Sequence, residues 1–366
     1  MPPVTVHLVA AARPNFMKIA PLFHELSRRP WCRPLIIHTG QHYDYNMSAA
    51  FFADLGLPGP HLHLGVGSGP HGAQTARCLE AYEQVLMTEP PAWVVVAGDV
   101  NSTIACALAA AKLMIPVAHL EAGLRSFDRS MPEEINRLLT DQISDLLWTH
   151  SPEADANLRN EGVDPAKIER VGNIMIDSLA GLRPRMEAGQ PWRQWGLAPG
   201  AYGIVTLHRP ANVDQAGPLS QIMSVLAQAA SRLPLVFPVH PRTRARLEEL
   251  GLMALAQAAP NLHLTDPLGY LEFMGLVLRA RLAITDSGGI QEETTFLHIP
   301  CLTLRPNTER PVTVSQGTNR LVTPMELAAA LNEVLAGRWP QGQTPEFWDG
   351  HTAQRAADSL ARRCGV

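Results

Sequence analysis

One stretch of the chain, His119 to Arg137, places acidic and basic residues close together between an apolar segment and an amphipathic one. It reads HLEAGLRSFDRSMPEEINR and holds four carboxylates and three arginines, more charge than a packed core needs. Val117 to Leu120 indicate the end of a buried strand, so Glu121 is expected at its carboxyl edge, where open α/β sheets bind ligands. A carboxylate at that place has an uncompensated cost of desolvation unless a cation or a substrate contacts it. Glu121 is therefore the first candidate for chemistry.

The second half of this stretch has two interpretations, one structural and one functional. Ser130-Met131-Pro132-Glu133 matches a capping box with proline in the first turn of a helix. Glu133 and Arg137 stand four residues apart, the spacing of a helical ion pair that contributes roughly 0.3–0.5 kcal/mol. The sequence leaves open whether Glu133 is a cap or a reacting group.

Similar polar residues follow several other apolar runs, each at the predicted carboxyl end of a strand. The whole set is Arg13, Gln41-His42, Asp99, Glu121, His208 and His240. Any one of them fits a cap or a solvated loop residue, but six such places together fit one binding cleft. Proton transfer needs carboxylates or imidazole, so the candidates for catalysis are Asp99, Glu121, Glu133 and His208.

An anion-binding turn is indicated from Asp286 to Glu293, DSGGIQEE, where a strand ends and a helix begins. Gly288 and Gly289 allow close approach of the backbone, and free amides at a helix amino terminus favour a phosphate. A simple helix cap at Ser287 is the alternative. Glu293 is a candidate acceptor for ribose hydroxyls, and Arg310 and Arg13 are candidate cationic contacts. The turn is neither a Walker A loop nor a GxGxxG fingerprint.

Composition excludes several classes of protein. A net charge of −4 over 366 residues, with 46% hydrophobic and 17% charged residues, is typical of a soluble globular chain and argues against nucleic-acid binding. No run of eighteen apolar residues and no signal-peptide pattern occurs, so we expect a cytoplasmic protein without membrane contact. The five cysteines lie far apart and no HExxH or GxSxG motif occurs, which predicts no metal site and no serine-hydrolase chemistry.

The elements that position these residues alternate between strands and helices. Apolar runs such as Val4 to Ala11 and Trp93 to Asp99 predict strands, and helical periodicity follows each of them. Predicted strands of the second half are 202–208, 235–240, 261–265, 281–286 and 301–304. This alternation predicts an α/β fold of two doubly wound, Rossmann-like domains that face a central cleft. We expect residues 1–172 to form the first domain and 173–351 the second, with 352–366 packing back onto the first.

These clusters resemble the motifs of the non-hydrolysing UDP-N-acetylglucosamine 2-epimerase family, which has a glycosyltransferase-B-like architecture. The resemblance runs from Val4 to about Val322. It rests on these segments: Ala12-Arg13-Pro14 with Lys18, Thr39-Gly40-Gln41-His42, Gly98-Asp99, His119 to Arg125, Pro132 to Arg137, Thr206-Leu207-His208-Arg209, Pro238-Val239-His240-Pro241, Thr285 to Glu293, and Glu309-Arg310-Pro311 with Gly317-Thr318.

The resemblance implies that a homodimer converts UDP-GlcNAc reversibly to UDP-ManNAc without a cofactor. A base removes the proton at carbon 2 while UDP leaves, 2-acetamidoglucal forms, and protonation on the opposite face with return of UDP completes the inversion. Proton transfer and its organisation fall to Asp99, Glu121 and Glu133, with His208 near the diphosphate. UDP is assigned to the second domain and to Arg13, Lys18, Ser287, Gly288, Gly289, Glu293 and Arg310, while the substrate site is also shaped by Gln41, His42, Arg137 and His240. Which carboxylate serves which face stays open.

One departure from the family concerns regulation. Some bacterial members carry a second UDP-GlcNAc site that activates the enzyme, associated with a Gln-His-Arg turn and a His-Arg-Arg-Glu turn. Here the equivalent turns read Gln41-His42-Tyr43-Asp44 and His208-Arg209-Pro210-Ala211-Asn212, so arginines are missing where the anionic substrate would bind. We therefore expect activation by UDP-GlcNAc to be weak or absent.

Other functions stay open beside this one. A hydrolysing relative would release UDP and free ManNAc, because the elimination step is shared and only the fate of the glucal differs. A close variant would epimerise a UDP-HexNAc modified at carbon 3 or carbon 6. A retaining glycosyltransferase of the same architecture would show no proton exchange at carbon 2, and a nonenzymatic nucleotide-sugar sensor would bind without turnover.

Overall fold

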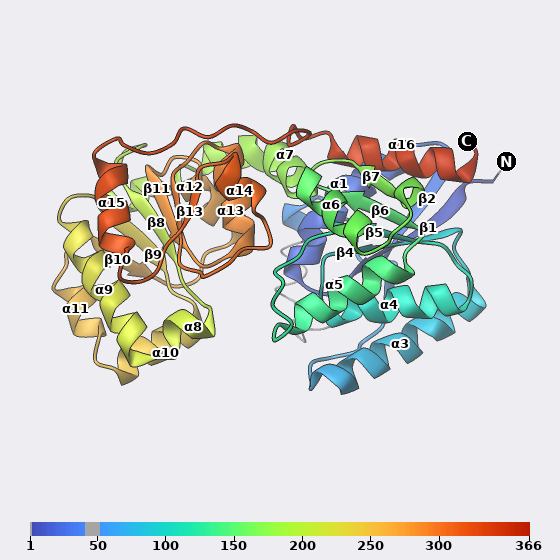
Figure 1. Cartoon of the computed structure of the whole chain (residues 1–366), viewed down its shortest axis with the longest axis horizontal. Coiled ribbons are helices and arrows are strands. Elements are labelled where there is room, and N and C mark those ends of the chain that lie inside the picture. The colour runs from blue at the N-terminus through green and yellow to red at the C-terminus, as the bar shows by residue number, and fades with distance from the viewer. Residues whose placement is uncertain (1, 41–51) are drawn as a thin grey trace. The chain divides into compact units, whose positions relative to one another are not determined.

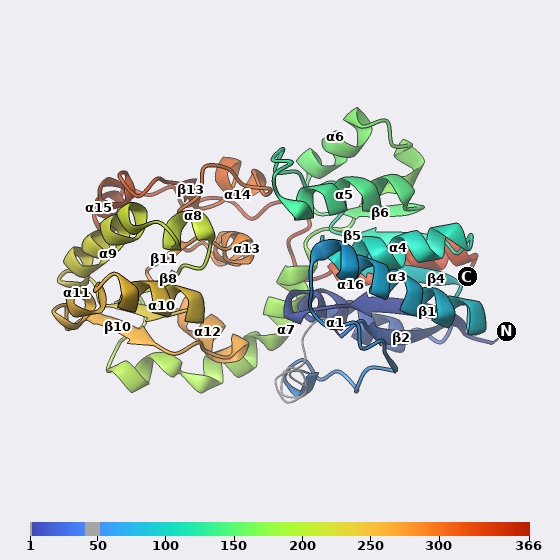
Figure 2. The same ribbon diagram turned by 90° about the horizontal axis from the view of Figure 1, so that it is seen from below.

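The computed structural model describes residues 2–40 and 52–366, apart from the side chain of Arg13. Within it the chain forms two compact units. Unit 1 consists of Met1–Gly181 and Glu346–Val366, and unit 2 of Leu182–Pro345. Each unit has one parallel sheet with helices packed on it (Figure 1 and Figure 2).

Unit 1 is built around a sheet of short, buried strands. Its described strands are β1 (Val4–Ala10), β2 (Cys32–His38), β3 (Leu62–His63), β4 (Trp93–Ala97), β5 (Val117–Leu120), β6 (Leu146–Thr149) and β7 (Ile168–Arg170). They lie in the order β3-β2-β1-β4-β5-β6-β7, and neighbouring strands are parallel. The central strands are nearly continuous apolar runs because helices cover both faces of the sheet.

The helices of unit 1 pack in two layers. They are α1 (Arg13–Ser27), α3 (His71–Thr88), α4 (Asn101–Lys112), α5 (Pro132–Ile143), α6 (Pro152–Asn160), α7 (Ile174–Gly189) and α16 (Thr352–Cys364), with the 3-10 turn η1 (Pro165–Lys167). Helices α3, α4 and α5 pack together on one face, and α1 and α16 lie side by side on the other (Figure 1). Arg29 of α1 lies 2.9 Å from the carboxylate of Asp358 in α16. Asp177 of α7 accepts hydrogen bonds from two backbone N–H groups at the start of α16, which caps that helix.

Unit 2 repeats the same plan with a sheet of its own. Its described strands are β8 (Gly203–Thr206), β9 (Leu235–Pro238), β10 (Leu262–Thr265), β11 (Leu282–Thr285), β12 (Cys301–Thr303) and β13 (Asn319–Leu321), in the order β10-β9-β8-β11-β12-β13. The connections contain η2 (Pro191–Trp195), α8 (Pro210–Val213), α9 (Ala216–Ala230), α10 (Pro241–Glu249), α11 (Met253–Gln257), α12 (Tyr270–Val277), α13 (Gly288–Phe296), α14 (Val312–Ser315) and α15 (Leu327–Leu335). Helices α9, α11 and α15 cover one apolar core, and α13 packs with α14 beside β13.

Each sheet has one point where the order of its strands reverses. In unit 1 this switch point lies between β1 and β4, and in unit 2 it lies between β8 and β11. The chain leaves the two strands in opposite directions at such a point, which opens a crevice at their carboxyl ends where ligands bind in doubly wound folds. The polar clusters described below follow β1, β4, β5, β8 and β11.

The predicted α/β architecture is confirmed. All five predicted strands of the second half are present, each within two residues of its expected ends. The sequence did not indicate β3, β7 and β13, because strands of two or three residues such as Asn319–Leu321 carry too little periodicity.

The division between the units differs from the expected one after residue 172. Unit 1 continues to Gly181, and it also takes Glu346–Val366, a longer final segment than 352–366. Helix α7 begins in unit 1, where Ile174 and Leu179 are buried, and ends in unit 2, where Met186 is buried. Because its two ends pack in different units, this helix has no single apolar stripe, and its sequence gave no helical signal.

Candidate active site

The candidate residues of unit 1 lie at the carboxyl end of its sheet. Lys18 lies in α1, Asp99 and Glu121 follow β4 and β5, and Glu133 and Arg137 lie in α5. Gln41 and His42 lie outside the described residues. Arg13 is the first residue of α1, and its side chain lies outside the description as well.

Glu121 occupies an unusual backbone and a nearly closed side-chain environment. Its φ is 72°, in the left-handed region that non-glycine residues rarely adopt and that clusters at functional sites. Its side chain is 4% exposed, and Oε2 forms an ion pair with Nζ of Lys18. The other oxygen, Oε1, is buried without a hydrogen-bond partner in the described structure. A carboxylate held this way offers one oxygen to a proton or to a substrate donor.

Gly98 makes this ion pair possible. The strands β4 and β5 are adjacent, and the backbone N–H of Gly98 donates to Leu120 at 3.1 Å, so the turns after both strands lie at one level. Gly98 has a φ of 68°, and a Cβ atom at this position would lie 2.7 Å from Nζ of Lys18. A residue with a side chain therefore cannot stand here unless Lys18 moves.

Asp99 is held by an arginine that also holds a second carboxylate. Nε and Nη2 of Arg137 lie 2.9 and 2.8 Å from Oδ2 of Asp99, and Nη1 pairs with Glu134. Glu134 in turn accepts hydrogen bonds from the backbone N–H groups of Ser126 and Phe127, at 2.9 and 2.8 Å. This chain of charges links the start of α5 to Asp99 and to the loop that precedes the helix.

The capping-box interpretation of Ser130 and Glu133, one of the two left open by the sequence, is wrong. Helix α5 has Met131 at its N-cap position, without a side-chain cap bond, and the hydroxyl of Ser130 donates instead to Asp128 at 2.6 Å. The expected ion pair between Glu133 and Arg137 is also wrong, because Arg137 turns inward to Asp99 and Glu134. Glu133 is partly exposed, and no hydrogen bond or ion pair engages it within the described part of the chain.

A buried charge network beneath these residues was not foreseen from the sequence. Nδ1 of His119 lies 2.6 Å from Oδ1 of Asp141, and Nε2 lies 2.9 Å from the carbonyl oxygen of Gly98. Oδ2 of Asp141 accepts from the N–H of Gly123 at 3.1 Å and pairs with Arg125 at 2.7 Å. Burial alone would raise the pKa of Asp141, but the neighbouring His119 and Arg125 lower it overall. Asp141 therefore ties the turn after β4 to the turn after β5.

This network also fixes the orientation of its histidine ring. Both ring nitrogens of His119 face oxygen atoms, a carboxylate oxygen of Asp141 and the carbonyl oxygen of Gly98, so the ring is held on both sides. The signal for such a network is weak in a sequence, because Asp141 lies two turns into α5 and far from the motif that contains His119.

In unit 2 the candidate imidazole is held by a buried aspartate. His208 follows β8, and its Nδ1 lies 2.8 Å from Oδ1 of Asp286, which follows the adjacent strand β11. Asp286 also accepts from the backbone N–H of Arg209 at 2.9 Å and from the amide of Asn212 at 3.0 Å. Burial raises the pKa of Asp286, but the hydrogen bond from His208 and the charge of that ring lower it below the usual value. His240 lies nearby, with 6.2 Å between the two imidazole centroids.

The turn from Ser287 to Gly289 forms the amino end of α13 beside a guanidinium group. Ser287 occupies the N-cap position without a side-chain cap bond, and the first amides of a helix have no partners within it. A Cβ atom on Gly288 would lie 2.7 Å from Nη1 of Arg310, so this glycine lets the guanidinium lie against the turn. Nε of Arg310 lies 3.0 Å from Glu292, which orients it. Amides and a guanidinium at one place suit an anion such as a phosphate.

Glu293 lies one turn into the same helix and is buried. Its Oε1 accepts a hydrogen bond from the hydroxyl of Tyr270 at 2.9 Å, which the sequence did not suggest. The predicted set in unit 2 is thus brought together in two groups, His208 with His240, and Ser287, Gly288 and Gly289 with Arg310.

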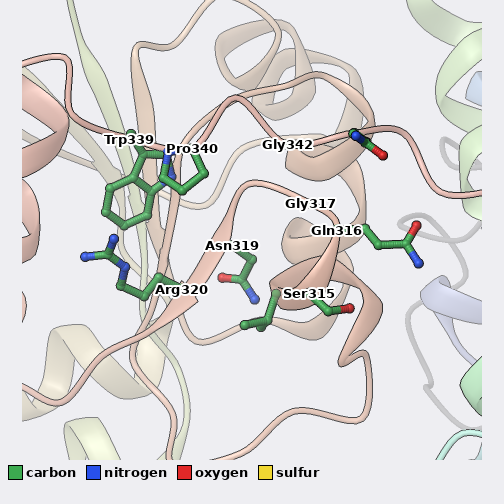
Figure 3. Close-up of a pocket in the computed structure, with 10 residues that line it drawn as sticks. Ser315, Gln316, Gly317, Asn319, Arg320, Trp339, Pro340 and Gly342 are labelled. Atoms are coloured by element: carbon green, nitrogen blue, oxygen red, sulfur yellow. The ribbon is translucent and has the colours of Figure 1, made fainter.

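Figure 3 shows a cavity that is a separate feature of unit 2. Its volume is about 520 Å³, and it lies where the chain enters β13, next to the segment from Trp339 to Gln343. The guanidinium carbon of Arg320 lies 4.2 Å from the centroid of the Trp339 ring. None of the described site residues lines this cavity, which lies at the amino end of β13 rather than at the carboxyl end. It is therefore not part of the candidate site.

The described residues contain neither a cluster that could bind a metal ion nor a helix that could span a membrane. Among residues 2–40 and 52–366, no group of three or more His, Cys, Asp or Glu side chains has a geometry that could hold a metal ion. In the same part of the chain, none of the helices has the length and apolar character needed to cross a membrane.

Comparison with known proteins identifies the family. Residues 24–361 match the profile described as UDP-N-acetylglucosamine 2-epimerase. A UDP-N-acetylglucosamine 2-epimerase homolog of Methanococcus maripaludis is 46% identical over 316 residues, covering 86% of this chain and 87% of its own. A UDP-2,3-diacetamido-2,3-dideoxy-D-glucuronate 2-epimerase of Pseudomonas aeruginosa is 41% identical over 359 residues, covering 97% of this chain and 98% of its own.

A solved structure agrees with these matches. The crystal structure of the Methanocaldococcus jannaschii UDP-GlcNAc 2-epimerase in complex with UDP-GlcNAc and UDP has a TM-score of 0.86 and 40% identity, covering 98% of this chain and 99% of its own. This match also confirms the predicted glycosyltransferase-B-like fold class. The chain belongs to the UDP-N-acetylglucosamine 2-epimerase family of enzymes.

Proposed function

We propose that the chain epimerises UDP-GlcNAc at carbon 2, reversibly and without hydrolysis or an external cofactor. The observation that carries the proposal is Glu121, a carboxylate in left-handed backbone with one oxygen paired to Lys18 and the other buried without a partner among residues 2–40 and 52–366. Among the described residues this oxygen has no structural task, and Glu121 follows β5, the neighbour of β4, at the carboxyl edge of the sheet beside its switch point.

The reaction divides into an elimination and its reversal. A base takes the proton from carbon 2, the bond between carbon 1 and the phosphate oxygen breaks, and UDP and 2-acetamidoglucal result. A proton then adds to carbon 2 from the opposite face while the phosphate oxygen of UDP returns to carbon 1. Each face needs one group able to carry a proton, and Asp99, Glu121 and Glu133 are assigned to these transfers and to their organisation. Arg137 fixes Asp99 for this task.

Departure of UDP needs donors that meet the negative charge of the diphosphate. We assign this to the helix-start amides of Gly288 and Gly289 and to Ser287, whose own amide donates to the hydroxyl of Thr285 at 2.9 Å, together with Arg310. His208 is placed near the diphosphate, with His240 shaping its surroundings. Glu293 is assigned to the ribose. Arg13, Lys18, Gln41 and His42 complete the predicted substrate contacts.

One incubation tests the reaction. The protein is mixed with UDP-GlcNAc in deuterated water and followed by proton NMR. Epimerisation predicts loss of the carbon 2 proton signal to deuterium and the growth of a second nucleotide sugar, UDP-ManNAc. If folded protein produces neither the exchange at carbon 2 nor UDP-ManNAc, the proposal is refuted. Free ManNAc and UDP in place of UDP-ManNAc would identify the hydrolysing alternative. Transfer of the sugar to an acceptor without deuterium at carbon 2 would identify a glycosyltransferase.

The assigned carboxylates can be tested one by one. Glu121→Gln and Asp99→Asn should each reduce kcat by ~10²- to 10⁴-fold, the usual effect of losing a general acid or base. Glu80→Gln is the matched control, since Glu80 is an exposed residue of α3. A variant whose rate stays near that of the wild type removes its residue from the mechanism.

A second candidate substrate has a specific basis. The Pseudomonas aeruginosa relative matches nearly the full length of this chain, and its name gives a diacetamido sugar acid as substrate. The discriminating measurement is kcat/KM for UDP-GlcNAc and for UDP-2,3-diacetamido-2,3-dideoxy-D-glucuronate on the same preparation. The substrate with the higher value is the physiological class.

We also propose a homodimer that works in the cytoplasm, as the family resemblance implies. Light scattering during size exclusion should give twice the subunit mass of 39.9 kDa. Initial rates should follow a simple hyperbola with UDP-GlcNAc, because each of the two activating turns lacks an arginine here, with Tyr43 after Gln41-His42 and Pro210 after His208-Arg209. Sigmoidal rates, or turnover of pure UDP-ManNAc that waits for added UDP-GlcNAc, would contradict the absence of activation.

A further inference from the structure

We propose that Asp286 is a positioning residue that holds His208 in one tautomer and one orientation, with Nε2 presented for reaction. The kinetic part of this inference rests on the proposed function, whereas the tautomer itself does not. Asp286 lies in the turn already expected to bind an anion, but its carboxylate contacts His208 and Arg209 in the turn after β8.

The hydrogen bonds around Asp286 determine which nitrogen of His208 carries a proton. The two carboxylate oxygens receive the backbone N–H of His208 at 3.2 and 3.1 Å, the N–H of Arg209 at 2.9 Å and the amide of Asn212 at 3.0 Å. Every one of these neighbours is a donor, so the carboxylate is an acceptor throughout and is ionised. Nδ1 of His208, 2.8 Å from Oδ1, must then donate as well. In the neutral ring this leaves the lone pair on Nε2.

Buried contacts between neighbouring strands hold the Asp286–His208 pair in place. Asp286 is fully buried, and it follows β11, which pairs in parallel with β8 through Thr285 and Thr206. The hydroxyls of those two threonines lie 3.0 Å apart directly before the pair. Asn212 joins the carboxylate to the backbone oxygen of Leu304 at 2.9 Å, which ties the turn to the strand beyond. The His208 side chain is 44% exposed while its aspartate is not, so the ring is anchored on one side and open on the other.

This arrangement is similar to that of the aspartate that orients the catalytic histidine in serine proteases. In serine proteases, changing such an aspartate to asparagine leaves the geometry intact and lowers kcat by about 10⁴-fold, because the wrong tautomer is stabilised. Here the amide of an asparagine would present an N–H to Nδ1 of His208, which would move the proton to Nε2. The residue acts through His208 and touches no substrate atom itself.

The kinetic test is Asp286→Asn. We expect kcat for UDP-GlcNAc epimerisation to fall by at least ~10²-fold, with the affinity for UDP, measured by calorimetry, within about threefold of the wild type. The matched control is Asp266→Asn in the same unit, whose carboxylate is 92% exposed and pairs with Arg244, and which should change neither value. A kcat for Asp286→Asn within about threefold of the wild type would overturn the proposal.

A spectroscopic test does not depend on turnover. Histidine labelled with ¹⁵N reports its tautomer in long-range proton–nitrogen NMR spectra, and the variant His208→Gln identifies the signal of His208. At neutral pH we expect the wild type to show the tautomer with the proton on Nδ1, and Asp286→Asn to show the proton on Nε2. A wild-type signal with the proton on Nε2 overturns the proposal even if Asp286→Asn does not fold. A proton on Nδ1 in a protein that does not epimerise would refute the proposed function and leave the positioning role intact.

Discussion

Lys18 and Glu121 form an ion pair between α1 and the turn after β5, and the pair leaves Oε1 of Glu121 buried without a hydrogen bond to any part of the chain that the structure describes. The side chains are 11% and 4% exposed, so neither charge is well hydrated. A buried pair of this kind contributes little net stability, but removing one partner leaves an uncompensated charge. The fold therefore holds a carboxylate against an ammonium group at the edge of the sheet and keeps one of its oxygens available.

The first prediction concerns this pair. Lys18→Met should lower kcat by ~10²-fold or more and should destabilise the protein by up to about 3 kcal/mol, because Glu121 loses its counter-charge. Urea unfolding and initial rates measure the two effects. Lys112→Met is the matched control, since Lys112 is exposed at the end of α4. Lys18→Met combined with Glu121→Gln should recover stability but not activity, and recovery of both would show that the charge pair has no catalytic part.

The second prediction separates backbone strain from crowding at Gly98. Gly98→Ala should cost about 1–3 kcal/mol of stability and also reduce kcat, because the new Cβ would lie 2.7 Å from Nζ of Lys18 in left-handed backbone. Gly162→Ala is the control, because Gly162 has a φ of 80° and no atom within 4 Å of the new Cβ. That variant should lose stability alone. Equal rates for the two variants would mean that crowding of Lys18 does not matter to catalysis.

The fold was predictable because its long strands are apolar runs that helical segments separate. The position of Glu121 after β5 was likewise predictable, since a buried strand ending in a carboxylate is a local pattern. The choice between Glu133 and Glu134 was not, because neighbouring residues of a helix point in directions about 100° apart and only the packing of α5 decides which faces inward. Glu134 is buried and paired, whereas Glu133 is the one left partly exposed.

The residues that hold the site histidines in place are the hardest to predict from the sequence. Asp141 lies 2.6 Å from His119, and Asp286 lies 2.8 Å from His208, although each pair joins different elements. The contact of Asp286 with His208 depends on the order of strands in the sheet, which brings β8 beside β11, and the contact of Asp141 with His119 depends on how α5 packs against β5. No local pattern encodes either strand order or helix packing, so a single sequence indicates the reacting groups before it indicates the residues that hold them in place.

The third prediction tests the arginine that bridges two carboxylates. Arg137→Lys should lower kcat/KM by roughly tenfold to a hundredfold, because one ammonium group cannot hold both Asp99 and Glu134 in the planar geometry of a guanidinium. Rates with UDP-GlcNAc measure this. The control is Arg159→Lys, whose side chain is 55% exposed. An Arg137→Lys enzyme with unchanged kcat/KM would mean that Asp99 needs no fixed position.

The last prediction concerns pH and a histidine far from the chemistry. His7 is buried in β1, its Nδ1 lies 3.1 Å from the hydroxyl of Tyr82, and burial lowers its pKa from 6.5 to about 4. The unfolded chain therefore binds a proton at His7 between pH 6.5 and 4 while the folded protein does not. By linkage the free energy of unfolding must fall as the pH drops through that window, by about 2–3 kcal/mol at pH 4.5 from this residue.

The measurement compares the wild type with His7→Gln, which keeps a hydrogen-bonding group beside Tyr82 but cannot be protonated in this range. Urea unfolding at pH 7 and pH 4.5 should show a loss that is about 2–3 kcal/mol smaller in the variant. Asp141 and Asp286 do not affect this difference, because the wild type and His7→Gln both contain them. Their pKa values are also lowered, so the stability that they contribute is lost only at more acidic pH. Parallel losses in the two proteins would mean that His7 is protonated in the folded state as easily as in the unfolded chain.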